Sequence, residues 1–265
     1  MISIVIPTYN EADVIEQTLT RAAAALAKTG ECFELIVVDD SSPDGTADIS
    51  EALASKLPIR VLRRPGRHGL ATAVTAGWQA AQGDVLGVMD GDLQHPPEVL
   101  AGLVQALKRD SKDLVIASRY VNGGGTTDWS WLRVIISWGA TRLARLALPG
   151  VLAGIADPMS GMFLVRADAL HGVLLDPVGY KILLEVLAKA RYTTVVEIPY
   201  VFTRRPVGSS KLGTRQYWEY LRHVARLAGS SHRPVRAESL PANLRPTFIS
   251  STTEKYIGGG RQIAP

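Results

Sequence analysis

Short apolar runs alternate with helix-like segments along the first 117 residues, and this alternation limits the fold more than any other feature. The apolar runs predict strands at residues 2–6, 33–38, 59–62, 84–89 and 113–117. Strands that read as apolar throughout are typical of parallel sheets that are buried on both faces. Helices between parallel strands form right-handed crossovers, so the chain is expected to form an α/β fold with a mostly parallel, doubly wound sheet and helices on both faces.

The fourth of these runs ends in two acids. Asp90 and Asp92 stand where the strand stops, and Pro96 and Pro97 then favour the start of a helix. Ligands of open α/β sheets bind outside the carboxyl ends of the strands, and two neighbouring carboxylates there suit a divalent cation with oxygen ligands. An isolated pair of acids would be read as a solvated strand end. Further acids follow the first and second strands, at Glu11, Asp39 and Asp40, and favour a cation and polar-ligand site.

Composition is that of a globular, intracellular chain. Of the 265 residues, 46% are hydrophobic and 20% are charged, which is enough to bury a substantial core. The single cysteine, Cys32, excludes an internal disulfide and suggests a reducing compartment. The chain begins directly with a strand, so we expect no secretion signal. The longest apolar stretch, residues 129–148, contains three arginines and is not expected to span a bilayer.

Several common nucleotide and hydrolase motifs are missing from the sequence. The glycine fingerprint of dinucleotide-binding folds is absent after the first strand, and neither a phosphate-binding P-loop nor a G-x-S-x-G nucleophile elbow occurs. The five histidines show no spacing typical of metal ligands, so each is interpreted as structural. The commonest redox, ATPase and esterase functions are therefore disfavoured.

Positive charge is concentrated near the carboxyl terminus. Residues 204–236 contain eight Lys or Arg and one acid, Glu219, which indicates an anionic partner such as phosphate or lipid head groups. Few aromatic residues are interleaved with these cations, so nucleic acid is not expected to be a partner. A final amphipathic helix is predicted around residues 217–228, and residues 230–265 are expected to be a polar, disordered tail.

Five motifs, taken together, resemble one family. They lie at residues 7–11, 38–46, 90–98, 118–120 and 208–212, and in this order they look like family 2 glycosyltransferases, more narrowly the dolichol-phosphate (polyprenol-phosphate) mannosyltransferases. The resemblance runs from about residue 2 to residue 228. It implies a GT-A fold in one domain, residues 1–229, with a nucleotide-binding half (1–117) and an acceptor and membrane-facing half (118–229).

The resemblance also implies the roles of individual residues. The guanosine part of GDP-mannose would be held by Pro7, Tyr9, Glu11, Val38 and Asp40. The sugar, the diphosphate and a Mg²⁺ or Mn²⁺ ion would meet Asp90, Gly91, Asp92 and Gln94, with Asp92, Gln94 and Asp90 as metal ligands. The phosphates would be served by Arg119, Arg205 and Lys211, and the catalytic set would be Asp92, Arg119 and Arg205.

The chemistry fits these residue types. Displacing a nucleoside diphosphate builds negative charge that a divalent cation can neutralise. A polyprenyl (dolichyl) phosphate is already anionic, so it needs no strong general base but does need cations that hold two anions together. Attack opposite the leaving group would invert the anomeric centre and give a β-linked mannose.

A lipid acceptor implies a membrane surface, and a peripheral position on the cytoplasmic face is expected. The segment at 129–148 places Trp129, Trp131 and Trp138 beside arginines, which suits an interfacial helix, although a helix buried in the core is an equal alternative. Many relatives carry carboxyl-terminal membrane helices where this chain has a polar tail, so a membrane-anchoring partner subunit is a further possibility.

Some residues depart from the family pattern, and two rival functions stay open. Gly91 stands where relatives often have Ala, and Met159 and Met162 vary an Asp-Pro-x-Ser-Gly-Phe segment. The nearest rival is transfer of glucose or a related sugar from a UDP donor to undecaprenyl phosphate. The non-enzymatic rival is an accessory protein that binds a nucleotide sugar.

Overall fold

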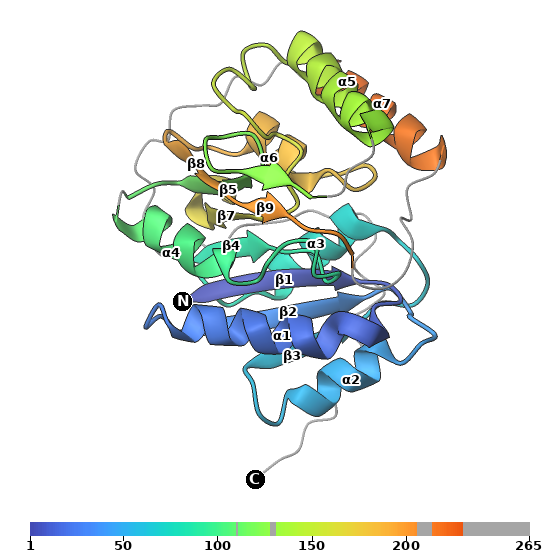
Figure 1. Cartoon of the computed structure of the whole chain (residues 1–265), viewed down its shortest axis with the longest axis vertical. Coiled ribbons are helices and arrows are strands. Elements are labelled where there is room, and N and C mark those ends of the chain that lie inside the picture. Colours follow the sequence, from blue (N-terminus) through green and yellow to red (C-terminus); the bar gives the residue numbers. More distant parts are fainter. Residues whose placement is uncertain (110, 128–130, 206–213, 230–265) are drawn as a thin grey trace.

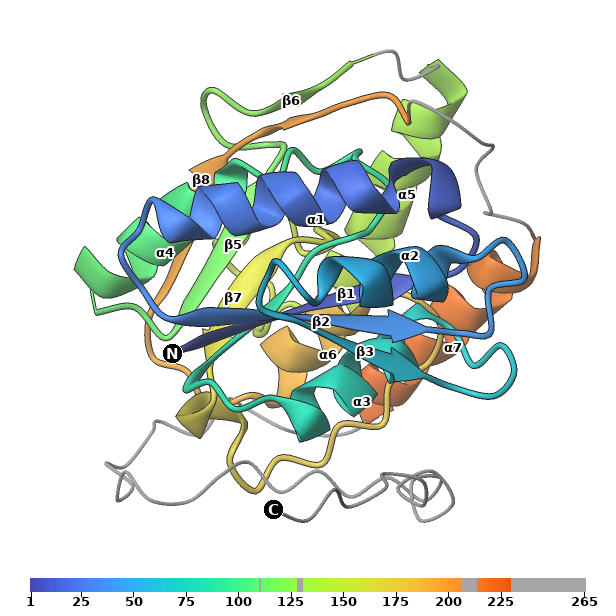
Figure 2. The same ribbon diagram turned by 90° about the horizontal axis from the view of Figure 1, so that it is seen from below.

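A seven-stranded mixed sheet crosses the middle of the computed structural model, which describes residues 1–109, 111–127, 131–205 and 214–229 (Figures 1 and 2). The strands follow the order β3-β2-β1-β4-β7-β5-β8. Their bounds are β1 Ile2–Thr8, β2 Phe33–Asp39, β3 Ile59–Arg63, β4 Val85–Val88, β5 Leu114–Ser118, β7 Phe163–Arg166 and β8 Val195–Pro199. A second, two-stranded sheet pairs β6 (Gly125–Thr126) with β9 (Val201–Phe202).

Helices cover both faces of the large sheet. They are α1 Ala12–Ala27, α2 Thr46–Leu53, α3 Leu70–Ala80, α4 Val99–Arg109, α5 Trp131–Ala147, α6 Ile182–Lys189 and α7 Thr214–Gly229, with a 3₁₀ turn at Asp168–Leu170. Figure 2 shows α1, α2 and α4 on one face and α3 and α6 on the other. Helices α5 and α7 lie together at one end of the molecule (Figure 1).

Strand β1 shows why the sheet is buried on both faces. All seven of its residues are buried, and Ile2, Ile4 and Ile6 pack into the cluster under α1 and α4. Val5 points to the opposite side and packs into the cluster with α3. This alternation follows from the two-residue period of a strand, and it confirms the predicted α/β class with helices on both faces.

The strand order differs from a purely parallel sheet at one place. Strands β3, β2, β1 and β4 are parallel, as predicted, but β7 lies between β4 and β5 and is antiparallel to both. Strand β8 is again parallel to β5. The helix expected to start near Pro96 and Pro97 is α4, which begins at Val99. Residues 230–265, expected to form a disordered tail, lie outside the described residues.

Helix α5 is amphipathic rather than buried. Ala144 and Leu148 pack into the core, whereas Trp131 is 74% exposed and Leu146 is 79% exposed. Trp218 of α7 is also 73% exposed. In the part of the chain that the structure describes, no helix combines the length and the apolar character that a membrane crossing requires.

A buried polar cluster joins α6 to α7. The Glu185 carboxylate is fully buried and accepts hydrogen bonds from His223 Nε2 at 2.6 Å and from Lys189 Nζ. The backbone N–H of Asp176 also donates to Glu185 at 3.1 Å, and Arg226 pairs with Asp176 at 2.6 Å. Burial alone would raise the pKa of Glu185, but the hydrogen bonds from His223 and Lys189 outweigh it and lower the pKa to about 2.

Replacing Glu185 with glutamine is therefore expected to destabilise the fold at neutral pH by about 2–4 kcal/mol. Because the pKa is lower in the folded state than the ordinary 4.5, the carboxylate stabilises the fold above pH 4.5. This stabilisation is lost as the pH falls from 4.5 to about 2. Urea unfolding of the wild-type and variant proteins should thus converge in that range. Glu51→Gln, which breaks an exposed pair with Arg63, is the control and should change stability by at most about 1 kcal/mol.

Candidate active site

The turn after β4 carries the predicted metal ligands. Asp92 Oδ1 accepts the backbone N–H of Gln94 at 3.0 Å, which closes a tight turn. Leu93, between them, has a φ of 61°, a left-handed conformation that is strained for a branched side chain. Thr203 supports this turn because its hydroxyl donates to Leu93 O at 3.1 Å and its backbone N–H donates to Gln94 O at 3.0 Å.

Two of the predicted site residues meet directly. Arg205 Nη2 lies 2.5 Å from Asp92 Oδ2, and Asp92 is only 6% exposed. The Gln94 side-chain amide donates to Thr203 O at 3.3 Å, which leaves its carbonyl oxygen as the atom for a ligand. The segment after β8 thus brings a cation and a supporting threonine to the acidic turn.

Asp90 lies beside Asp92 in the same turn. Burial and the charge of Asp92 raise the pKa of Asp90 above its ordinary value, and Lys181 and Arg205 oppose this shift. His95 is 3% exposed, and burial lowers the pKa of this imidazole to about 4, so it is neutral near pH 7. Lys181 is held nearby by a hydrogen bond from its Nζ to Met159 O at 2.8 Å.

Two glycines, Gly91 and Gly161, leave space for the side chains around this acidic turn. A Cβ on Gly91 would lie 3.2 Å from Thr8 Cγ2, a contact that a small shift of the methyl group relieves. A Cβ on Gly161 would lie 2.7 Å from Asp90 Oδ2 and 3.0 Å from His95 Cε1. Gly161 therefore fixes where the Asp90 carboxylate can lie.

Gly161→Ala is expected to displace the Asp90 carboxylate and to lower activity by about a hundredfold, because ångström-scale misplacement of reacting groups costs that much. Circular dichroism and thermal melting should show a folded protein, since the clash is with a side chain. Gly139→Ala is the matched control, because a Cβ there meets no atom within 4 Å. Equal activity of Gly161→Ala and wild type would show that the Asp90 position is not critical.

Arg119, predicted to serve the phosphates, is engaged by an acid in this structure. Its Nε and Nη2 lie 2.7 Å from the two carboxylate oxygens of Asp157, and its backbone N–H donates to the same carboxylate at 3.0 Å. Asp157 is fully buried and Arg119 is 7% exposed. Glu197 of β8 in turn accepts the backbone N–H groups of Ala156 and Asp157 at 2.6 and 2.8 Å. A phosphate-binding role for Arg119 stays a prediction.

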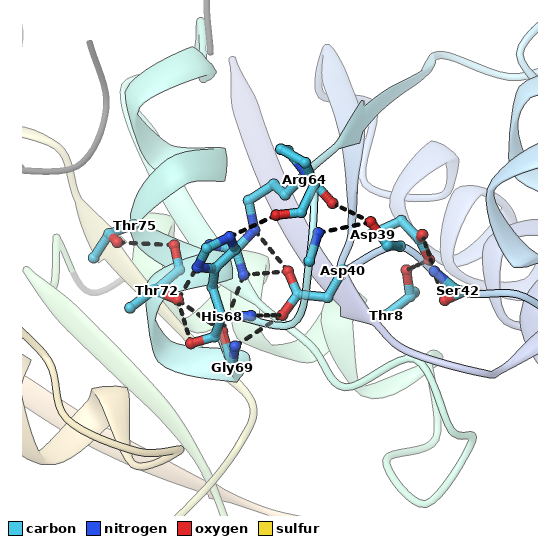
Figure 3. A network of polar contacts seen from close by, with 12 residues as sticks. Thr8, Asp39, Asp40, Ser42, Arg64, His68, Gly69, Thr72 and Thr75 are labelled. Atoms are coloured by element: carbon cyan, nitrogen blue, oxygen red, sulfur yellow. Dashed lines mark hydrogen bonds and ion pairs between the residues drawn. The ribbon is translucent and has the colours of Figure 1, made fainter. Parts of the chain in front are cut away.

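The two aspartates at the end of β2 organise the edge of the sheet that is predicted to bind the nucleotide (Figure 3). Asp39 accepts hydrogen bonds from Thr8 Oγ1 and from the backbone and hydroxyl of Ser42. Asp40 accepts Arg64 Nε at 2.7 Å and the backbone N–H groups of His68 and Gly69 at 3.0 and 2.8 Å. Asp40 therefore holds the loop before α3, and its predicted contact with guanosine stays a prediction.

The other residues that are predicted to contact the sugar-nucleotide donor lie near this edge, at the ends of β1 and β2. The Arg67 guanidinium lies 4.3 Å from the centre of the Tyr9 ring, and the backbone N–H of Glu11 donates to Thr46 Oγ1 at 2.9 Å. Pro7 and Val38 are buried neighbours in β1 and β2. Lys211 lies outside the described residues.

Sequence reasoning missed several residues that shape the site. His95 was interpreted as a structural histidine, and no role was predicted for Asp157, Gly161, Lys181 or Thr203. Their partners are distant in the sequence, so no local spacing of residues predicts these contacts. The segment at residues 157–161 was recognised as part of the family pattern, and the acid and the glycine that it contains are the signal that could have been used.

The residues present fit a divalent cation. Asp90, Asp92 and Gln94 offer oxygen atoms, and Asp90 Oδ1 is buried with no hydrogen-bond partner among the described residues. In the same part of the chain, no group of three or more His, Cys, Asp or Glu forms a complete metal cage. Such a partial donor set suits a cation that also takes oxygens from a diphosphate.

Comparison with known proteins identifies the family. The model of glycosyl transferase family 2 matches residues 3–174. The chain belongs to this family. A dolichol-phosphate mannosyltransferase from Pyrococcus furiosus is 47% identical over 226 residues, which are 85% of this chain and 63% of that protein. An undecaprenyl-phosphate mannosyltransferase from Micrococcus luteus is 36% identical over 217 residues, 78% of this chain and 86% of that protein. The chain thus spans less than two thirds of the Pyrococcus relative.

Solved structures of this glycosyltransferase type share the fold. A mannosyltransferase from Pyrobaculum calidifontis in complex with GDP-Man and Mn²⁺ superposes with a TM-score of 0.59 at 18% identity, over 88% of this chain and 65% of that chain. A glucosyl-3-phosphoglycerate synthase from Mycobacterium tuberculosis in complex with Mn²⁺, UDP-Glc and phosphoglyceric acid superposes with a TM-score of 0.63 at 19% identity. The superposition covers 86% of this chain and 80% of that chain. The predicted GT-A fold is confirmed.

Proposed function

We propose that this glycosyltransferase transfers mannose from GDP-mannose to a polyprenyl (dolichyl) phosphate, with inversion at the anomeric carbon. The observation that carries the proposal is the turn after β4, where Asp90, Asp92 and Gln94 lie together and Arg205 reaches Asp92. The names of the relatives support the mannosyl and lipid-phosphate parts, and a structural neighbour that binds GDP-Man and Mn²⁺ supports the donor.

Each part of the site has a task in this reaction. Asp92, Gln94 and Asp90 would hold Mg²⁺ or Mn²⁺, which when bound neutralises charge on the leaving diphosphate. Arg205, freed from Asp92 by the cation, would hold a phosphate, as would Lys211. The lipid phosphate is itself the nucleophile, so the protein has to position two anions rather than remove a proton.

A surface made by α5 and α7 supports a membrane-bound acceptor. Trp131, Ile135, Trp138 and Leu146 of α5 and Trp218 of α7 are exposed, and the Arg142 guanidinium lies 4.7 Å from the Trp138 ring centre. Aromatic and apolar side chains next to arginine are typical of helices that lie in the membrane interface. We propose that this surface rests on the cytoplasmic face of a membrane, with or without an anchoring subunit.

A transfer assay tests the proposal. Purified protein is incubated with Mn²⁺ or Mg²⁺, a short polyprenyl phosphate and either GDP-mannose or UDP-glucose. Lipid-linked mannose that disappears with EDTA is the expected result. Transfer from UDP-glucose alone would be consistent with the proposed mechanism but would contradict GDP-mannose as the donor. Nucleotide binding without any transfer would favour the alternative function, an accessory protein that binds a nucleotide sugar.

A further inference from the structure

His95 occupies a position behind the acidic turn that is fixed by aromatic packing. Its ring stacks on Tyr200 with centroids 5.4 Å apart and an interplanar angle of 18°, and it meets the edge of Phe202 at 5.1 Å and 89°. The side chain is 3% exposed. The imidazole therefore has little freedom to turn, and the direction of its nitrogen atoms is set by the packing.

One of these nitrogens faces Asp90. His95 Nδ1 lies 3.5 Å from Asp90 Oδ2, and within the described residues both His95 Nδ1 and Asp90 Oδ1 are buried without a hydrogen-bond partner. Buried polar atoms are rarely left without a partner, so two such atoms on neighbouring side chains need an explanation. The oxygen that faces His95 Nδ1 is Oδ2, the other oxygen of the same carboxylate. The separation is slightly longer than an N–H···O hydrogen bond of about 2.7–3.2 Å. Such contacts are often long without substrate and shorten when it binds.

The surroundings make Asp90 dependent on this contact. Gly161 packs closely against this contact: a Cβ there would lie 2.7 Å from Asp90 Oδ2 and 3.0 Å from His95 Cε1, so the absence of a side chain lets the carboxylate and the imidazole lie next to each other. The two neighbouring oxygen ligands, by contrast, are held by other residues: Asp92 by Arg205 and Gln94 by Thr203. His95 is thus the group placed to orient the third.

We propose that His95 is a positioning residue that donates its Nδ1–H to Asp90 and orients that carboxylate toward the divalent cation and the donor sugar. The assignment rests on the proposed metal-dependent transfer, and it gives His95 a role in addition to filling the core. Groups that orient a metal ligand typically change metal affinity or activity by about 10- to 100-fold when they are removed.

Three substitutions separate positioning from packing. His95→Phe keeps an aromatic ring against Tyr200 and Phe202 but has no donor. His95→Asn places its amide nitrogen where Nδ1 stands, whereas His95→Gln places it nearer to Nε2. Mn²⁺ binding in the presence of GDP is measured by electron paramagnetic resonance, GDP binding by calorimetry, and folding by thermal melting. His223→Phe is the matched control, because His223 is equally buried and hydrogen-bonded to Glu185 outside the site.

We expect His95→Phe and His95→Gln to weaken Mn²⁺ binding by about 10- to 100-fold while His95→Asn recovers most of the affinity. His223→Phe should lower the melting temperature and leave Mn²⁺ binding unchanged. A folded His95→Phe protein with the Mn²⁺ affinity of the wild type would overturn the assignment. If His95→Phe does not fold, equal Mn²⁺ affinities of His95→Asn and His95→Gln would overturn it. Wild-type protein that binds GDP but no Mn²⁺ would instead overturn the metal-dependent function itself.

Discussion

Replacing Asp92 with asparagine is expected to lower kcat/KM for mannosyl transfer by about a thousandfold, equivalent to about 4 kcal/mol of transition-state stabilisation. Asp92 lies in the turn after the buried strand β4, and its carboxylate accepts the Gln94 N–H and pairs with Arg205. Asparagine keeps the shape and the oxygen that accepts the Gln94 N–H, but it removes the charge that a cation needs. The loss should therefore fall on metal-dependent steps.

Measurement of transfer over a series of Mn²⁺ concentrations tests this expectation. Donor binding should lose its dependence on Mn²⁺. The melting temperature without metal should also fall, because the variant weakens the largely buried pair of Asp92 with Arg205, so the loss of metal dependence is the result that tests the role. Asp48→Asn, an exposed acid of α2 that pairs with Arg63, provides the control and should leave transfer unchanged. An Asp92→Asn protein with full transfer and an intact response to Mn²⁺ would refute the role of Asp92.

Asp157→Asn is expected to destabilise the protein by about 3–5 kcal/mol, because it leaves the buried Arg119 guanidinium without a compensating charge. Asp157 is fully buried and accepts three N–H groups of Arg119, two of them at 2.7 Å. A loss of this size is a large part of the total stability of a typical domain, about 5–15 kcal/mol. Activity should fall with it, because Arg119 begins the loop that leads to β6 and α5.

Glu98→Gln is the matched control for this second prediction. Arg21 and Glu98 form an equally short two-pronged pair at 2.8 Å, but both side chains are exposed. Exposed pairs contribute at most about 1 kcal/mol, so urea unfolding should separate the two variants clearly. Similar stability losses in both would mean that burial does not decide the strength of these pairs.

The fold could be predicted from the sequence where local pattern determines it. Mostly apolar runs such as β1 and β2 identify buried parallel strands, and the acids at and after their ends mark the predicted ligand edge of the sheet. Strand β7 shows the limit of this reasoning. Its residues, Phe163–Arg166, suit a central strand in either direction, and only the pairing with β4 and β5 makes it antiparallel.

The site was predictable where a motif carries the chemistry and unpredictable where a partner is distant. The turn of Asp90, Asp92 and Gln94 follows from the sequence, and Arg205 was expected among its cations. The pairing of Arg119 with Asp157 and of Glu185 with His223 joins segments 38 residues apart in each case. No periodicity connects such segments, so only the folded chain shows which acid neutralises which cation.

The position of β7 also has a consequence for synthesis of the protein on the ribosome. Strand β4 carries the acidic turn but is the edge of the sheet until β7, which is translated much later, pairs with it. An unpaired strand edge is a template for wrong association. During translation the first half of the sheet therefore exposes β4 next to the turn of Asp90 and Asp92, and a nascent chain released before β7 would present that edge to other chains.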